Sequence, residues 1–313
     1  MTKQKIKQIS KYFLLLLAAL LLLAMSSAPA LAAASPTGAD KPSVLPQKAE
    51  PLTGITVKSN SKATVDASNL QEGYIMVKYT GGRNVKIKVQ ITKQGGVTYT
   101  YNLNSGGTTE TYPLSEGNGK YTVSVFENVS GNSYTQAFSC TLDMTLRNTF
   151  LPFLYPSQYV NYKLDSQVAA KAAELTKNLA KEMEKLTGIY YFVVNNFTYD
   201  TELAATVTSG YLPDVDKVLE RKKGICFDYA AVMSSMLRLQ NIPCKLVVGY
   251  AGTVYHAWIN VYITDIGWID KVIYFDGKNW SLMDPTFVSS GRSSQQVLQY
   301  VSDGKNYSQK YVY

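Results

Sequence analysis

Short runs of alternating apolar and polar residues fill the chain from about Thr53 to Leu146, and they constrain its fold more than any other feature. Examples are GYIMVKYT, NVKIKVQITK, VTYTYNL and KYTVSVFEN. Clusters of glycine, asparagine and serine separate the runs at intervals of about ten residues, which is typical of an antiparallel β-sandwich. We therefore expect residues 53–150 to form an all-β domain of immunoglobulin-like type.

The rest of the chain carries helical patterns first and strand patterns afterwards. DSQVAAKAAELTKNLAKEMEKL has apolar residues at helical spacing, namely Val168, Ala172, Leu175 and Leu179. We predict a second helix in DVDKVLERKKG, capped by Asp214 and ending at Gly224, and a third from about Cys226 toward Gln240. CKLVVGYA, VYHAWINVYI, KVIYFDG and NWSLMDPTF follow as strands. This order indicates an α+β domain at residues 151–313.

The N-terminus has the pattern of an export signal. Four lysines without an acid precede the apolar run FLLLLAALLLLAM, and SSAPALA offers a cleavage site after Ala32. We expect residues 1–32 to be removed and the proline-rich residues 33–52 to form an extended linker. The mature protein would then be secreted, with no stable membrane anchor, and cell-wall association would be compatible with its charge.

Charge and cysteine content narrow the function classes. Removal of residues 1–32 takes away four of the 31 basic residues and none of the 23 acids, which lowers the net charge from +8 to +4. No basic run is long enough to indicate nucleic-acid binding. Cys140 and Cys244 could form one disulfide, but we favour two small buried residues, because an exported protein that relies on disulfides usually has more cysteines.

Cys226 is the candidate nucleophile. At the first turn of a helix, unpaired backbone N–H groups and the helix dipole favour an anion, so a thiol there is biased toward the reactive thiolate. His256 is the only histidine of the chain and lies in the predicted strand VYHAWINVYI. It is the candidate base of a Cys-His pair. Asp284 lies in NWSLMDPTF, the second strand pattern after that of His256, and could hold the imidazole.

Three motifs in order resemble the transglutaminase-like superfamily of papain-type cysteine enzymes: GICFDYAAVMSSMLRLQNIPCKLVVGY, HAWINVYI and WSLMDPTF. The resemblance covers about residues 162–288. It implies a papain-like catalytic domain of helices followed by an antiparallel sheet, with Cys226, His256 and Asp284 as the triad. The segment between the last two motifs is longer than is usual in that family, which leaves Asp265, Asp270 and Asp276 as alternative acids. Cys244 stands where the family commonly has a small residue, and we favour core packing over a second reactive thiol.

Further residues are candidates for the substrate cleft. An acyl-transfer enzyme stabilises a tetrahedral oxyanion, for which the backbone N–H of Cys226 is the natural donor and the hydroxyl of Tyr211 a second candidate. We expect Tyr229 and Trp258 to wall the cleft. Asp228 could cap the helix or contact the substrate, and we favour capping.

These observations predict an exported thiol-dependent acyl transferase or amide hydrolase that acts on protein or peptide carboxamides, such as cell-wall peptide, through a thioester on Cys226. The reaction needs no metal and no organic cofactor. The sequence does not separate hydrolysis from transfer to an amine. The alternative is a non-catalytic cell-surface or cell-wall binding protein, in which the sandwich binds and the catalytic domain is a relic.

Overall fold

The computed structural model describes residues 54–251, 253–270, 273–275, 280–282 and 307–313. All of them belong to one compact unit, residues 37–313. The predicted export signal and the predicted linker lie outside the described residues, so both remain predictions. None of the described helices is long and apolar enough to cross a membrane.

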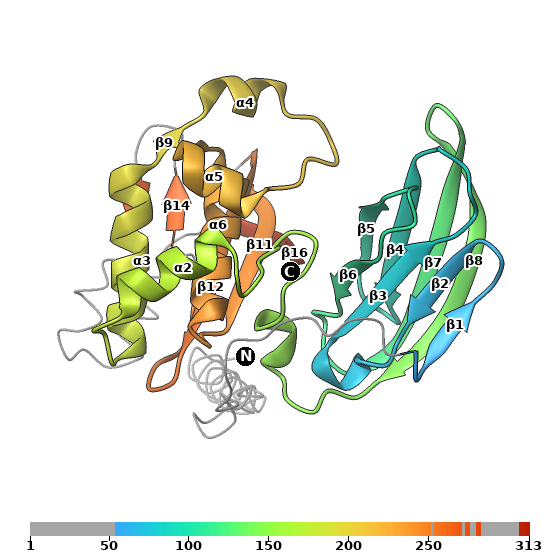
Figure 1. The fold of residues 1–313 in the computed structure, drawn as a ribbon, viewed down its shortest axis with the longest axis horizontal. Coiled ribbons are helices and arrows are strands. Elements are labelled where there is room, and N and C mark those ends of the chain that lie inside the picture. The colour runs from blue at the N-terminus through green and yellow to red at the C-terminus, as the bar shows by residue number, and fades with distance from the viewer. Residues whose placement is uncertain (1–53, 252, 271–272, 276–279, 283–306) are drawn as a thin grey trace, which may run out of the picture. The chain divides into compact units, whose positions relative to one another are not determined.

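Eight antiparallel strands form two four-stranded sheets in the N-terminal part of the described chain (Figure 1). One sheet has the order β1 (Val57–Ser59), β2 (Ala63–Asp66), β3 (Tyr74–Tyr79) and β6 (Glu110–Pro113). The other has the order β5 (Thr98–Leu103), β4 (Ile87–Lys93), β7 (Gly119–Ser130) and β8 (Ser133–Met144). Alternate residues of β4 and β5 are buried, as the sequence pattern predicts for strands with one face in the core.

One short 3-10 helix, Leu70–Glu72, lies between β2 and β3, and another, Leu151–Phe153, follows β8. The α-helices follow as α2 (Gln167–Thr176), α3 (Glu182–Asn196), α4 (Thr201–Thr206), α5 (Val215–Arg221) and α6 (Cys226–Leu239). The single helix predicted for residues 165–186 is therefore two. A new helix begins at Glu182, where the carboxylate of Glu184 accepts the backbone N–H of Lys181 at 3.3 Å and caps the helix start.

The helix predicted to end at Gly224 ends earlier. Helix α5 stops at Arg221, because Lys222 adopts a left-handed conformation with φ of 50°. Gly224 instead belongs to the short strand β10 (Lys223–Gly224), which pairs in parallel with β9 (Thr198–Tyr199). The predicted cap at the other end is confirmed, since Asp214 accepts the backbone N–H of Lys217 at 3.2 Å.

The C-terminal part of the described chain contains an antiparallel sheet with the order β13 (Gly267–Ile269), β12 (Val254–Ile263), β11 (Cys244–Ala251) and β16 (Tyr307–Val312). A separate pair consists of β14 (Ile273–Phe275) and β15 (Trp280–Leu282). Helix α6 packs against β11 and β12, and α2, α3 and α5 pack around it (Figure 1). The α+β, papain-like fold class with an N-terminal β-rich region is therefore confirmed.

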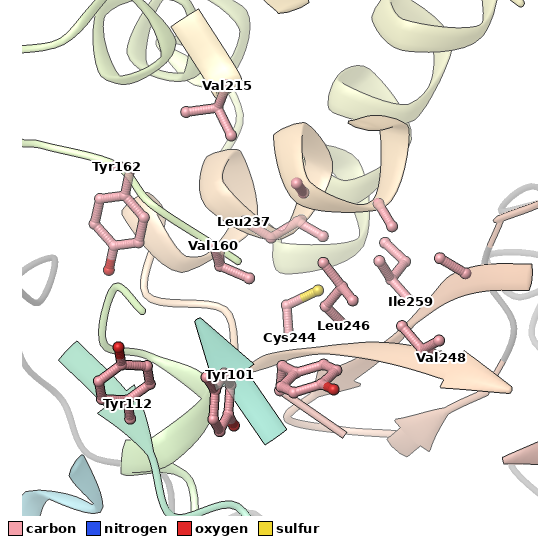
Figure 2. Close-up of a cluster of buried hydrophobic side chains, with 14 of the residues drawn as sticks. Tyr101, Tyr112, Val160, Tyr162, Val215, Leu237, Cys244, Leu246, Val248 and Ile259 are labelled. Carbon is pink, nitrogen blue, oxygen red and sulfur yellow. The ribbon is translucent and has the colours of Figure 1, made fainter. Parts of the chain in front are cut away.

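Cys244 belongs to the core between α6 and the sheet. It is fully buried and lies among Leu237, Leu246 and Ile259 (Figure 2). Its sulfur is 3.3 Å from the Ser234 hydroxyl. Core packing of Cys244 is thus confirmed, and all three cysteines are free; Cys140 is only half-buried.

Strand β16 was not predicted, although its sequence alternates in the manner of a strand. It pairs with β11, where a bulge separates Val248 from Gly249. A Cβ on Gly249 would lie 2.0 Å from the carbonyl oxygen of Ser308. Only glycine therefore allows β16 to approach β11 this closely.

Candidate active site

Cys226 is the first residue of α6, as predicted. Ile225, the residue before the helix, has an extended backbone, and the helical conformation begins at Cys226. The Cys226 side chain is partly exposed. The backbone N–H groups of Ala257, Phe227 and Cys226 itself point at the sulfur. Ala257 is the residue after His256 on β12, so the thiol lies against the strand that carries the only imidazole.

Asp228 fixes the turn that presents this cysteine. Its carboxylate is fully buried and accepts the backbone N–H of Ile225 at 2.9 Å, so the predicted capping role is confirmed. A Cβ on Gly224 would lie 2.6 Å from the Cβ and 2.7 Å from the Oδ2 of Asp228. The glycine and the aspartate of this motif are therefore required together, because the carboxylate occupies the space of the missing side chain.

Tyr211, which lies outside helix α6, contacts the residue that caps this turn. Its hydroxyl donates to Oδ1 of Asp228 at 2.6 Å, and Nη2 of Arg221 lies 3.3 Å from the tyrosine oxygen. Burial and the bond to Asp228 raise the pKa of Tyr211 to about 12. Tyr211 also lines the cavity, in agreement with its predicted place in the cleft. Its role as an oxyanion donor stays a prediction.

The thiol of Cys226 is not ionised by its helix position alone. Burial raises its pKa to about 11, and the three backbone N–H groups that point at the sulfur only partly offset the effect. Burial therefore opposes the thiolate bias that was predicted from the helix terminus. The physical reason is desolvation, which disfavours the charged form of a group more than one helix end favours it. The sulfur needs a proton acceptor in order to react.

His256 lies on β12, one residue before Ala257. It is buried, with 6% of its surface exposed, and pairs with Gly249 across β11 and β12. Residues 256–263 of β12 are all buried. This burial follows from the packing of α6 against β12.

Cys226 and His256 line the same cavity, whose volume is about 460 Å³. The segment between α4 and α5 supplies one wall, with Val207, Thr208, Ser209, Gly210 and Tyr211. Strands β11 and β12 supply Val248, Tyr255 and Ala257. The cavity has a size that can hold a peptide side chain next to a nucleophile and a base.

Two residues predicted to wall the cleft do not reach it. Tyr229 and Trp258 are buried, with 1% and 3% of their surface exposed, and neither lines the cavity. Tyr229 lies on the core side of α6 and packs against Phe197, with ring centroids 5.6 Å apart. The Trp258 ring packs against Gly249 of β11, since a Cβ placed on that glycine would lie 2.9 Å from it. Both predictions of cleft positions are therefore corrected.

The acid of the predicted triad lies outside the described residues. This applies to Asp284 and to the alternative Asp276, so both remain predictions from the sequence. Asp265 and Asp270 are described, are exposed and do not line the cavity. Within the described ranges no group of three His, Cys, Asp or Glu side chains could hold a metal ion.

Sequence reasoning missed the aromatic residues of the cavity. The tyrosines among its lining residues that were not predicted are Tyr159, Tyr199, Tyr255, Tyr311 and Tyr313. A count of tyrosines, 24 in the whole chain, could have signalled an aromatic site, but not which of them meet at Cys226.

Comparisons with known proteins show which family the sequence around this cavity resembles. The sequence profile of the transglutaminase-like superfamily matches residues 169–271. The uncharacterized protein YebA of Bacillus subtilis is 26% identical over 173 aligned positions, and the match covers 48% of this chain and 22% of YebA. Human kyphoscoliosis peptidase is 28% identical over 148 aligned positions, and the match covers 41% of this chain and 20% of the peptidase. The matches thus span about a fifth of the length of these curated relatives.

Among solved structures, a candidate cysteine protease from Cytophaga hutchinsonii superimposes with a TM-score of 0.37 at 14% identity. The superposition covers 83% of this chain and 74% of that protein.

Proposed function

We propose that this chain, whose residues 169–271 form a transglutaminase-like domain, is a thiol-dependent enzyme that acts on protein or peptide carboxamides. The observation that carries the proposal is that Cys226, at the start of α6, and His256, on β12, line the same cavity. No other cysteine among the described residues lines this cavity.

The first half of the reaction forms a thioester. The proton of Cys226 passes to His256 as the sulfur attacks the carbonyl carbon, so that the low-dielectric site does not hold an unpaired thiolate before the attack. Backbone N–H groups at the start of α6, first that of Cys226, receive the negative charge on the carbonyl oxygen. The carbon–nitrogen bond then breaks, and His256 gives its proton to the departing amine.

The second half returns the free enzyme. Water or a primary amine attacks the thioester, loses a proton to His256, and leaves the substrate as an acid or as a new amide. The sulfur regains its proton as the carbon–sulfur bond breaks. Asp284 is proposed, on its motif, to orient the imidazole. Water as acceptor makes the enzyme an amidase or peptidase, and an amine makes it a cross-linking transferase.

The direct test uses Cys226→Ala with Cys140→Ala as the matched control. Both cysteines are partly exposed, but only Cys226 lines the cavity. Each variant is incubated with a glutamine-containing protein and a fluorescent primary amine, and both amine incorporation and ammonia release are measured. We expect Cys226→Ala to lose both activities and Cys140→Ala to keep them.

Incorporation of the amine identifies a transferase, and ammonia release without incorporation identifies an amidase. Unchanged turnover in Cys226→Ala would contradict the assignment. A folded wild-type protein without turnover or thiol reactivity would favour the binding-protein alternative.

We also propose export, on the N-terminal pattern alone. Expression in a secreting host should yield extracellular protein whose first residue is Ala33. Retention of residues 1–32 in the mature protein would contradict this part of the proposal.

A further inference from the structure

Part of the cavity wall comes from outside the transglutaminase-like residues 169–271. Four lining residues lie beyond those bounds: Thr100, Tyr159, Tyr311 and Tyr313. They belong to β5, to the segment before α2, and to the strand β16 with the residue after it. The β-rich region and the last strand therefore contribute directly to the space in front of Cys226.

The three tyrosines form a continuous aromatic wall. Tyr159 meets Tyr313 edge to face, with ring centroids 4.6 Å apart and an interplanar angle of 89°. Tyr311 lies 6.2 Å from Tyr313, and Tyr159 lies 5.3 Å from Phe227. Phe227 is the residue after Cys226 and also lines the cavity. The wall thus runs from β16 to the residue next to the reacting sulfur.

Backbone contacts hold this wall in place. Tyr313 and Leu246 exchange two backbone hydrogen bonds, of 2.8 and 2.9 Å. The buried guanidinium of Arg238 donates to the Tyr313 carbonyl oxygen at 2.9 Å. From the β-rich region, the Ser115 hydroxyl donates to the carbonyl oxygen of Val312 at 2.6 Å. Rings that are fixed in advance lose little freedom when a ligand packs on them.

Among the described residues, the cavity offers mainly aromatic surface. None of its lining residues within the described ranges is Asp, Glu, Lys or Arg. The nearest carboxylate in the turn, that of Asp228, already accepts from Tyr211 and Ile225. A charged substrate side chain would lose its hydration here without gaining a partner, whereas an aromatic ring would gain edge-to-face contacts.

We infer that Tyr159, Tyr311 and Tyr313 form a specificity wall that selects a peptide with an uncharged aromatic side chain next to the attacked carboxamide. The inference rests on the proposed function, because the wall can select a substrate only if Cys226 is the reacting residue. It also assigns the β-rich region a part in substrate choice, through Thr100 and through the support of β16.

The test uses the full chain and four peptides of the form acetyl-Gly-X-Gln-Gly-amide, with X as Phe, Ala, Asp or Lys. Amine incorporation and peptide cleavage are both followed by mass spectrometry, and kcat/KM is compared between peptides. Binding of the same peptides to Cys226→Ala is measured by calorimetry. The variants are Tyr311→Ala, Tyr311→Phe, and Tyr191→Ala as a partly exposed tyrosine of α3 that does not line the cavity.

We expect the wild type to prefer Phe over Asp and Lys by about a hundredfold, since the charged peptides lose hydration. Tyr311→Ala should reduce the preference for Phe over Ala by about tenfold, which is the scale of an aromatic contact. Tyr311→Phe and Tyr191→Ala should keep the wild-type preference. The Ala peptide should turn over similarly in the wild type and in Tyr191→Ala.

Turnover without a preference for Phe, or a preference that Tyr311→Ala retains, would overturn the inference and leave the proposed function standing. Phe-selective binding by Cys226→Ala, with no turnover by the wild type, would overturn the proposed function and support the wall. Neither binding nor turnover of any peptide would overturn both.

Discussion

At the scale of single residues, the site combines a buried thiol with a buried imidazole. Burial raises the pKa of Cys226 to about 11, so the resting sulfur is protonated at neutral pH. A helix start is therefore not a sufficient explanation of reactivity in this chain. The imidazole of His256 supplies what the helix does not, namely a proton acceptor in the same cavity.

Because the thiol depends on the imidazole as its proton acceptor, we predict how its labelling rate varies with pH. In His256→Ala, the rate of iodoacetamide labelling at Cys226 should still be rising above pH 9. The profile should have a single midpoint near pH 11. At pH 7 only about one thiol in ten thousand would then be ionised. The wild type should react about a hundredfold faster at pH 7.5, because general-base assistance is of that order.

The labelling is measured by intact mass, with Cys226→Ala as the background from Cys140 and Cys244. Superimposable pH profiles for the wild type and His256→Ala would show that the imidazole does not assist the thiol.

Gly224 gives a second prediction at this scale. An alanine there would place its Cβ 2.6 Å from the Cβ of Asp228, an atom close to the backbone that cannot rotate away. We expect Gly224→Ala to displace the cap on the Ile225 N–H and to lower the free energy of unfolding by about 1–3 kcal/mol. Turnover should fall as well, because the same turn presents Cys226.

Urea denaturation and kcat/KM measure the two effects. Gly106→Ala is the matched control, because its Cβ would meet only the side chain of Asn104, at 3.7 Å. Wild-type stability and turnover in Gly224→Ala would show that the close packing of Asp228 is not required.

At the scale of elements, the central helix α6 carries a fully buried cation that joins three segments. Arg238 donates to the carbonyl oxygens of Cys244 at 2.8 and 3.0 Å, of Tyr155 at 2.6 Å and of Tyr313 at 2.9 Å. Burial lowers its pKa. The helix that positions the thiol therefore also anchors the end of β16.

Replacement of this arginine should loosen all three segments. Arg238→Met removes four hydrogen bonds and leaves the carbonyl oxygens without those donors, so we expect a loss of about 3–5 kcal/mol in the free energy of unfolding. The backbone amides of β16 should also exchange faster with deuterium than those of β4. Arg221→Met, on an arginine that is partly exposed, should cost less than about 1 kcal/mol.

Chemical denaturation and hydrogen exchange provide the measurements. Equal stability of Arg238→Met and the wild type, with unchanged exchange in β16, would contradict the anchoring role.

Local sequence patterns predict some of the helix and strand boundaries but not others. Alternating runs correctly predict the strands of the β-rich region, since burial of one face imposes a period of two. Val168 and Ala172 are buried on α2 as their spacing predicts, yet the helix ends at Thr176. Thr176 donates to the Ala172 carbonyl and to the side chain of Gln240 on the far end of α6. The break depends on this contact between distant segments, which no local pattern contains.

At the scale of the whole molecule, the sequence predicts the parts of the site that lie in one continuous segment. Gly224, Cys226 and Asp228 fall in five successive positions, and His256 follows on a strand that packs against their helix. Tyr159, Tyr311 and Tyr313 could not be assigned in this way, because they reach the cavity only through tertiary pairing. Gly249, which admits β16, is likewise intelligible only once the partner strand is known.

The central claim is that Cys226 carries the acyl group of the substrate as a thioester, with His256 as the proton acceptor. Intact-mass spectrometry of the full chain, quenched in acid within seconds of mixing with a glutamine-containing peptide, tests it most directly. The account predicts an added mass equal to the peptide less ammonia, located on Cys226 by digestion, removed by neutral hydroxylamine and absent from Cys226→Ala. An adduct that persists in Cys226→Ala, or turnover without any adduct on Cys226 under conditions that trap thioesters, would contradict it.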